Sequence, residues 1–165
     1  MTSTNKLIVA IVIVAVLIIG VGYAAINSIT LQITGQLAAA PSDENFTVKF
    51  TNASPSEEGG NVVAKVTGDR TATLNVSGLT AKGDKAIATY TIQNASEDLS
   101  ANLTAAASNQ NDDYFTVSTS FSETSIAKGE TSTLTVTVEL IKTPVDGEET
   151  DTVGINIEAS PVQPQ

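Results

Sequence analysis

The stretch that decides the fold is LTAKGDKAIATYTI, residues 79–92, in which a short polar turn leads into an alternating run. Apolar residues stand at every second position of that run: Ala86, Ala88, Tyr90 and Ile92. Successive side chains of a β-strand point to opposite faces of the sheet, so a period of two predicts a strand with one buried face. Gly83 can adopt a positive φ and so close the tight turn that precedes the strand.

The same pattern returns in SIAKGETSTLTVTV, residues 125–138. Both stretches contain Ala-Lys-Gly, then an acidic residue, then a long alternating run, and Gly129 stands where Gly83 stands in the first copy. The polar Lys-Gly-acid tip favours a solvent-exposed turn at the start of a strand, and we prefer this interpretation to a ligand-binding loop.

Further alternating runs fill the chain beyond residue 40, and clusters of Gly, Asn, Asp and Ser separate them. The runs are Phe46–Phe50, Ala72–Val76, Leu99–Ala105, Phe115–Phe121, Leu134–Leu140 and Val153–Ala159, with a weaker one at Val62–Val66. The prolines are expected in connections or in the tail: Pro55, Pro144, Pro161 and Pro164. Short strands at this spacing, without a long helical period, predict an all-β fold, an antiparallel β-sandwich of the jelly-roll or Ig-like type.

The composition excludes several classes of function. The 165 residues include no histidine and no cysteine, so zinc proteases, serine–histidine catalysis, cysteine–histidine catalysis and disulfides are excluded. A formal net charge of −10 argues against binding to nucleic acid or to anionic lipid headgroups. We therefore expect a protein that is not an enzyme, with no catalytic residue, no cofactor and no metal site.

The N-terminus carries the most hydrophobic run of the chain. Leu7–Ile26 is long enough, at about 1.5 Å per residue, to cross the roughly 30 Å hydrocarbon core of a bilayer as a helix. Small residues at Gly22 and Ala24 also suit signal-peptide cleavage between Ala24 and Ala25. The run is thus a cleaved signal peptide or a retained membrane anchor, and both alternatives place the rest of the chain outside the membrane, secreted or on the cell surface.

A strand is predicted directly after this run, at residues 28–35. Its apolar residues, together with a later leucine, are Ile29, Leu31, Ile33 and Leu37. Such a strand either completes its own domain's sheet or is donated to the open edge of another subunit. The predicted organisation is therefore residues 1–24 as signal peptide or anchor, 25–40 as an N-terminal strand segment, and 41–165 as the β-sandwich domain.

Two segments resemble a known family. GYAAINSITLQITGQLAAA, residues 22–40, is similar to the signal-peptide junction and first strand of the TasA/camelysin family of secreted biofilm-matrix fibre proteins. The matching positions are Tyr23, Ala24, Ala25, Ile26, Asn27 and Ser28. Residues 78–107 resemble the family's turn and following strands through Leu79, Gly83, Asp84, Lys85, Tyr90, Ile92 and Asn94. The best-known members are longer, with insertions that this chain lacks.

This resemblance implies a jelly-roll-like sandwich and filaments in which each subunit's N-terminal strand enters its neighbour. The expected function is therefore a structural subunit of extracellular fibres whose partner is a second copy of itself. Burying the apolar residues of a donated strand would contribute about 1.5–3 kcal/mol each before the cost of ordering. The alternative is a membrane-anchored binding module or adhesin on the cell surface.

Two further groups of residues are candidate sites. N-glycosylation sequons begin at Asn45, Asn52, Asn75, Asn94 and Asn102, which is a frequency that a Ser- and Thr-rich chain produces by chance. Carboxylates at Asp112–Asp113 and in residues 146–151 have the oxygen ligands that Ca²⁺ prefers, but neither group has EF-hand spacing. We interpret both acidic groups as solvated loops.

Overall fold

The computed structural model describes residues 29–34, 46–56, 61–109, 111–145, 149 and 151–162. These residues contain no helix, so the fold is all-β as the sequence predicts. The strands that they form are β1 (Ile29–Thr34), β2 (Val48–Ser56), β3 (Asn61–Gly68), β4 (Thr71–Ser77), β5 (Lys85–Asn94), β6 (Ser100–Asn109), β7 (Phe115–Phe121), β8 (Ser125–Ile126), β9 (Thr131–Leu140) and β10 (Thr152–Val162). None of the ranges described above holds a helix that could span a bilayer, and the apolar run Leu7–Ile26 lies outside them.

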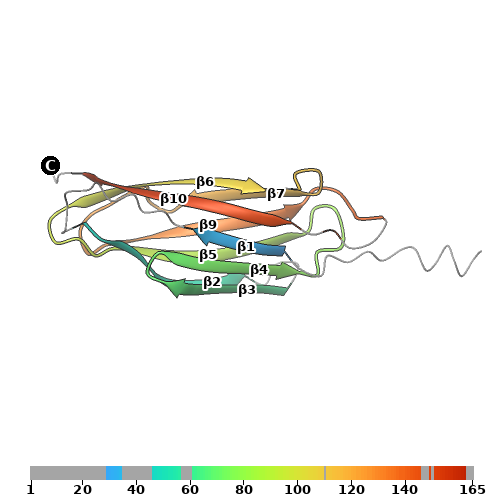
Figure 1. Ribbon diagram of the computed structural model, residues 1–165, viewed down its shortest axis with the longest axis horizontal. Helices are drawn as coiled ribbons and strands as arrows, with labels where there is room; N and C mark the ends of the chain where they lie inside the picture. The colour runs from blue at the N-terminus through green and yellow to red at the C-terminus, as the bar shows by residue number, and fades with distance from the viewer. Residues whose placement is uncertain are drawn as a thin grey trace, which may run out of the picture.

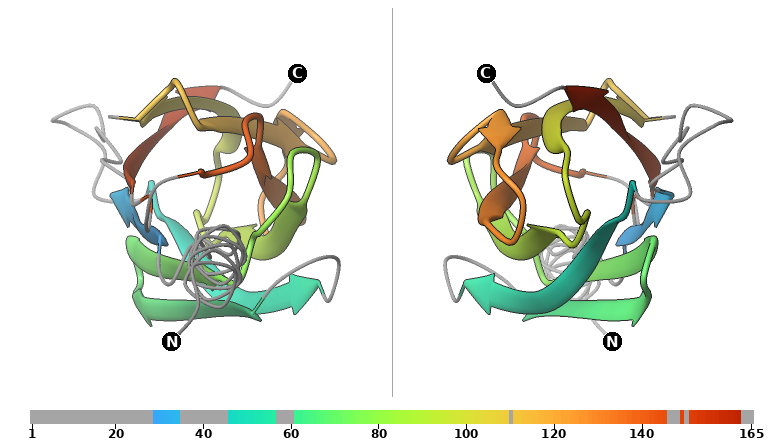
Figure 2. Two further views of the ribbon diagram at one scale, coloured as in Figure 1. Left: turned by 90° about the vertical axis from the view of Figure 1, so that its right-hand side faces the viewer. Right: turned by 90° about the vertical axis from the view of Figure 1, so that its left-hand side faces the viewer.

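The strands form two sheets that run along the long axis of the molecule (Figure 1). The larger sheet has the order β3-β4-β1-β10-β6-β8, and the smaller has the order β2-β5-β9-β7. Seen from either end, the strands surround a common interior (Figure 2). The pairings are antiparallel, except that β1 runs parallel to β10.

The interior is a hydrophobic core built from the alternating residues of both sheets. Ala86, Ala88, Tyr90 and Ile92 of β5 are buried, which confirms the inner face predicted from their spacing. Opposite them along β9, Leu134, Val136, Val138 and Leu140 are buried too. Coverage is thinner at β6 and β7, where Ala105, Val117 and Phe121 are only half-buried.

The two Ala-Lys-Gly-acid turns have the same geometry, which confirms the internal repeat. Gly83 and Gly129 have φ values of 96° and 79°. The Gly83 N–H donates to the Leu140 carbonyl at the end of β9, and the Gly129 N–H donates to the Asn94 carbonyl at the end of β5, each at 2.7 Å. Each turn therefore closes the end of the other repeat's strand.

The two repeats are related by a local two-fold axis, because each turn bonds to the end of the other repeat's strand. Thr89 and Thr135 occupy the same place in the two repeats, and they are direct partners in the β5–β9 register. The two outer strands of the smaller sheet, β2 and β7, flank this central pair in the same antiparallel sense. The repeat thus organises the whole four-stranded sheet.

The expectation for proline was wrong at two positions. Pro55 lies in β2 and Pro161 lies in β10. Strands accept proline where one side of the backbone has no partner. β2 is an outer strand, and at Pro161 the pairing with β6 continues while β1 has ended, since β1 pairs only with Thr152–Asn156.

Candidate assembly site: the place of β1 in the larger sheet

β1 lies between β4 and β10 and hydrogen-bonds to both (Figure 1). Its register is antiparallel to β4, from Ile29 opposite Val76 to Thr34 opposite Thr71. On its other side it is parallel to β10, from Thr30 opposite Thr152 to Thr34 opposite Asn156. We call the facing edges of β4 (71–76) and β10 (152–156) the β1 site.

The register matches the alternation read from the sequence. Leu31 is opposite Leu74 and Val153, both fully buried. Thr30, one position earlier, is opposite Asn75 and Thr152, which are both exposed. Direct partners across a ladder share a face of the sheet, so the apolar positions of β1 fall in the rows that line the core.

β1 alone joins two parts of the larger sheet in the described residues. β4 and β10 are not paired with each other there, so without β1 the sheet divides into β3–β4 and β10–β6–β8. Both β4 and β10 would then present unpaired backbone groups beside buried Leu74, Val76, Val153 and Ile155. An edge of this kind is a template for an added strand.

The connection from β1 to the next described residue, Phe46, runs through residues 35–45. A chain of that length spans up to about 40 Å when fully extended.

The other predicted residues of this segment lie outside the described ranges. These are Ala24 and Ala25 at the expected cleavage point, and Leu37 after the strand. Ile29, Leu31 and Ile33 do fall in β1, and the two end positions of the predicted strand, 28 and 35, lie outside the described ranges.

The sequons differ in accessibility. Asn52, Asn75 and Asn102 are exposed, whereas Asn94 is fully buried and Asn45 lies outside the described ranges. The Asn94 side chain donates to the carbonyls of Leu99 and Ile126, at 2.8 and 3.2 Å, and accepts from the Ser96 N–H at 3.1 Å. This residue therefore holds the fold together, a role that its sequon gave no reason to suspect.

The acidic loops are tied to one another through Asn111. Its N–H donates to Asp151 Oδ1 at 3.0 Å, and its side-chain amide donates to Glu149 Oε2 at 3.4 Å. Asp112 and Asp113 are exposed beside it. Within the ranges that could be searched, no three carboxylates converge as a metal site would require.

A buried phenol in the core is held by a hydrogen bond between the sheets. Tyr90 Oη donates to the Thr73 carbonyl at 3.0 Å, and burial raises the pKa of Tyr90. A neutral phenol pinned to a backbone carbonyl inside an aliphatic core is structural. Its ring also makes an edge-on contact with Phe50, with centroids 6.0 Å apart.

Sequence reasoning found the strand β1 but not the residues that receive it. The buried residues of β4 and β10 were predicted as core, yet nothing in their spacing indicates that they lie on either side of β1. The alternation of β4 and β10 is shared by β5 and β9, so it does not mark these two strands as the partners of β1. No model of a known protein family matches the chain, and no curated protein sequence matches it.

Proposed function

We propose that the protein is a structural subunit of extracellular fibres, in which β1 of one subunit occupies the β1 site of the next. The observation that carries the proposal is the position of β1, which fills the middle of a sheet although it stands at the N-terminal end of the chain. In this proposal the domain is a β-sandwich of the jelly-roll or Ig-like type, and the segment before it is the signal peptide.

Exchange of β1 between subunits would produce a fibre rather than a closed pair. The donated strand and the site that receives it are different surfaces, so the contact is head-to-tail and repeats along an axis. The same ladder bonds and apolar rows serve whether the strand comes from the same chain or from a neighbour. The resemblance to secreted biofilm-fibre proteins agrees with this assembly.

A cysteine pair tests which chain supplies β1, and the protein has no native cysteine to confuse the result. Thr30 and Asn75 are direct partners across β1 and β4. Chains that carry Thr30→Cys are mixed during expression with differently tagged chains that carry Asn75→Cys, and then oxidised. A disulfide that joins the two tags is expected if β1 is donated. Asn102→Cys, on exposed β6, replaces Asn75→Cys in the control.

A matched pair of substitutions tests whether β1 carries the assembly. Leu31→Asp places a carboxylate in the row of buried Leu74 and Val153, where an unpaired charge is costly. Thr30→Asp places the same charge in the row of exposed Asn75 and Thr152. Electron microscopy of the secreted protein should show fibres for Thr30→Asp and none for Leu31→Asp. Fibres from both variants would refute the proposal.

The second candidate function is a cell-surface binding module that keeps its membrane anchor. Pairing of β1 within its own chain favours it, because such a domain needs no neighbour to complete its sheet. Mass spectrometry of the mature protein separates the two candidates: Ala25 as first residue suits fibre assembly, whereas retention of residues 1–24 suits the anchor. In the anchored form, Thr30→Cys and Asn75→Cys should join only when both are in one chain.

A further inference from the structure

The outer strands of the two sheets differ in how they are protected against pairing with another chain. Charged residues, proline, register shifts and short length all hinder such pairing. β8 has only two residues, and β3 carries Lys65 and a register shift between Val66 and Gly68. β2 carries Lys49, a register shift between Phe50 and Asn52, and Pro55.

β7 has none of these features. Its sequence FTVSTSF contains no charge and no proline, and its pairing with β9 is regular from Phe115 to Phe121. β-Branched and aromatic residues are the ones that favour strands. Within the described part of the chain, β7 is therefore the outer strand most open to a new partner.

The backbone of β7 has alternate groups that point away from β9. The Ile141 N–H donates to the Tyr114 carbonyl and the Ser122 N–H donates to the Thr133 carbonyl, which places the bonds to β9 at even-numbered positions. In an antiparallel ladder the odd-numbered residues between them then face outward. Accordingly, the Phe115 carbonyl accepts from Asn109 Nδ2 and not from β9. Val117, Thr119 and Phe121 present the remaining outward groups.

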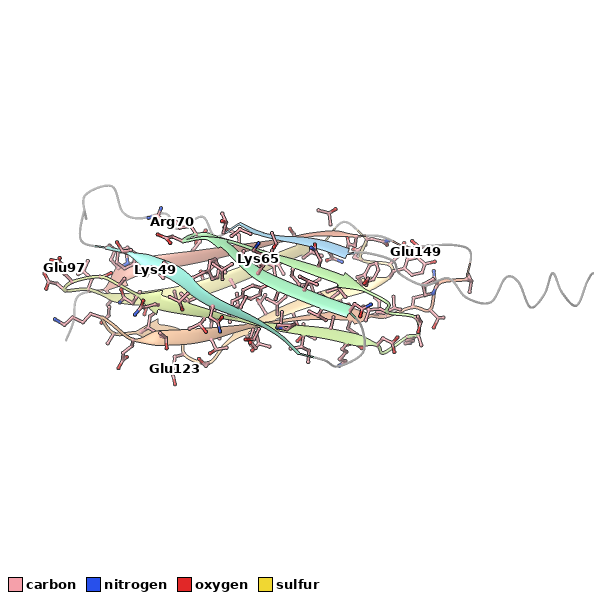
Figure 3. The ribbon with its side chains drawn as sticks, turned by 90° about the horizontal axis from the view of Figure 1, so that it is seen from below. Lys49, Lys65, Arg70, Glu97, Glu123 and Glu149 are labelled. Atoms are coloured by element: carbon pink, nitrogen blue, oxygen red, sulfur yellow. The ribbon has the colours of Figure 1, made fainter. Side chains whose placement is uncertain are left out.

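β7 itself carries no charged residue, although the chain has a formal net charge of −10 and Glu139 of β9 is the direct partner of Thr116. The adjacent strand β6 has no charged residue either, and Ala107 on it is exposed. By contrast, Lys49, Lys65 and Arg70 lie on the side of β2 and β3 (Figure 3). A charged partner would find nothing on β7 to pair with, whereas a second neutral strand meets no repulsion along its length.

We propose that β7 is a contact between copies of the protein, in which it pairs antiparallel with β7 of a second subunit. A register centred on Ser118 places Ser118 opposite its counterpart, Val117 opposite Thr119, and Phe115 opposite Phe121. The ladder hydrogen bonds then form between Val117 and Thr119, because the Phe115 N–H and carbonyl are already bonded to the Asn111 carbonyl and to Asn109 Nδ2. Aromatic and β-branched cross-strand pairs are stabilising, so the strand is complementary to itself.

This contact closes as a two-fold pair and makes one continuous sheet from two four-stranded sheets. It does not depend on exchange of β1. Just beyond the ends of β7, exposed Asp113 of each copy faces exposed Glu123 of the other copy. Repulsion there is screened by salt, so association should increase with ionic strength.

Cysteine crosslinking of the full-length protein tests the contact, because a single introduced cysteine is then the only thiol. Ser118→Cys lies on the exposed face at the centre of the proposed pairing. Oxidation of the protein should give a disulfide-linked dimer, and its yield should rise with salt. Ser54→Cys, exposed on the other outer strand β2, should give little dimer.

A second substitution tests whether backbone pairing holds the copies together. Thr119→Pro removes an N–H that faces away from β9 and so leaves the β7–β9 ladder intact. It should reduce the Ser118→Cys dimer at least fivefold, whereas Thr119→Val, which keeps the N–H, should not. No dimer from Ser118→Cys, or equal yields at positions 118 and 54, would overturn the proposal. Equal yields with Thr119→Pro and Thr119→Val would overturn pairing through the β7 edge.

Discussion

Replacing Asn94 by leucine is expected to destabilise the fold strongly although it exchanges a polar residue for an apolar one in the interior. The Asn94 side chain is fully buried at the end of β5, where it joins the β5–β6 turn to β8. Leucine has a similar size, so the change removes hydrogen bonds and leaves no large cavity.

The magnitude follows from the groups that lose their partner. The carbonyls of Leu99 and Ile126 lose a donor, and the Ser96 N–H loses an acceptor. At about 1 kcal/mol or more for each buried group left unsatisfied, the free energy of unfolding should fall by about 3 kcal/mol. For a chain of this size the melting temperature should fall by roughly 10 °C.

Asn94→Asp should cost more than Asn94→Leu at neutral pH. A carboxylate places negative oxygens against the carbonyls of Leu99 and Ile126, which need a donor. Asn102, exposed on β6 and also the first residue of a sequon, provides the matched control, and Asn102→Asp should change stability by less than about 0.5 kcal/mol.

Urea unfolding followed by circular dichroism measures these differences, with the midpoint and slope compared for each variant. The reasoning fails if Asn94→Leu costs less than about 1 kcal/mol, because three buried groups cannot lose their partners at so small a cost. It also fails if Asn102→Asp is as damaging as Asn94→Asp.

Three other predictions concern the smaller sheet and its turns. Ile92→Ala should cost about 2–5 kcal/mol as a large-to-small change in the core, and Thr91→Ala, on the outer face, less than about 1 kcal/mol; equal costs in urea unfolding would mean that the inner face is wrongly assigned. Gly83→Ala and Gly129→Ala should each lower the free energy of unfolding by about 1–2 kcal/mol, because a side chain disfavours the positive φ of both residues. The space around each Cβ position is open, so no steric clash adds to this cost. A clear difference between the two variants would show that the two turns are not equivalent. Hydrogen bonds from the Thr80 and Ala81 N–H groups lower the pKa of Asp84. The stabilisation of the fold by the ionised Asp84 carboxylate is therefore complete above the ordinary pKa of 3.8 and is lost as the pH falls through the lowered pKa. Asp84→Ala should therefore lower the melting temperature at pH 7 and converge with the parent protein in strong acid, whereas exposed Asp98→Ala should not change it at pH 7.

The strands could be predicted from the sequence because each one carries its own period of two. The run that ends at Ile92 and the run that ends at Leu140 both show their buried face without reference to any neighbour. β8 was missed because two residues, Ser125 and Ile126, cannot show a period. Pro55 and Pro161 were misplaced because their tolerance depends on which side of the strand lacks a partner, and that is a property of the sheet.

The order of the strands could not be predicted, because pairing is decided between residues far apart in the sequence. Leu31 alternates in the same way whether it pairs with β4, with β10 or with another subunit. Asn94 shows the same limit for side chains: its sequon is a local pattern, whereas its bond to Ile126 joins segments that only the fold brings together.

The two proposed contacts use different sheets, so each should be separable from the other. Leu31→Asp should abolish fibres while the Ser118→Cys dimer persists, because the smaller sheet that carries β7 contains no residue of β1. Thr119→Pro should leave fibres intact but single, because β1 exchange extends a fibre along its axis whereas β7 pairing joins fibres side by side. Electron microscopy of both secreted variants, with Thr30→Asp and Thr119→Val as controls, measures fibre length and fibre pairing separately. Loss of the Ser118→Cys dimer in the Leu31→Asp variant would show that pairing of β7 requires the fibre, and the two contacts would then have to be treated as one assembly step.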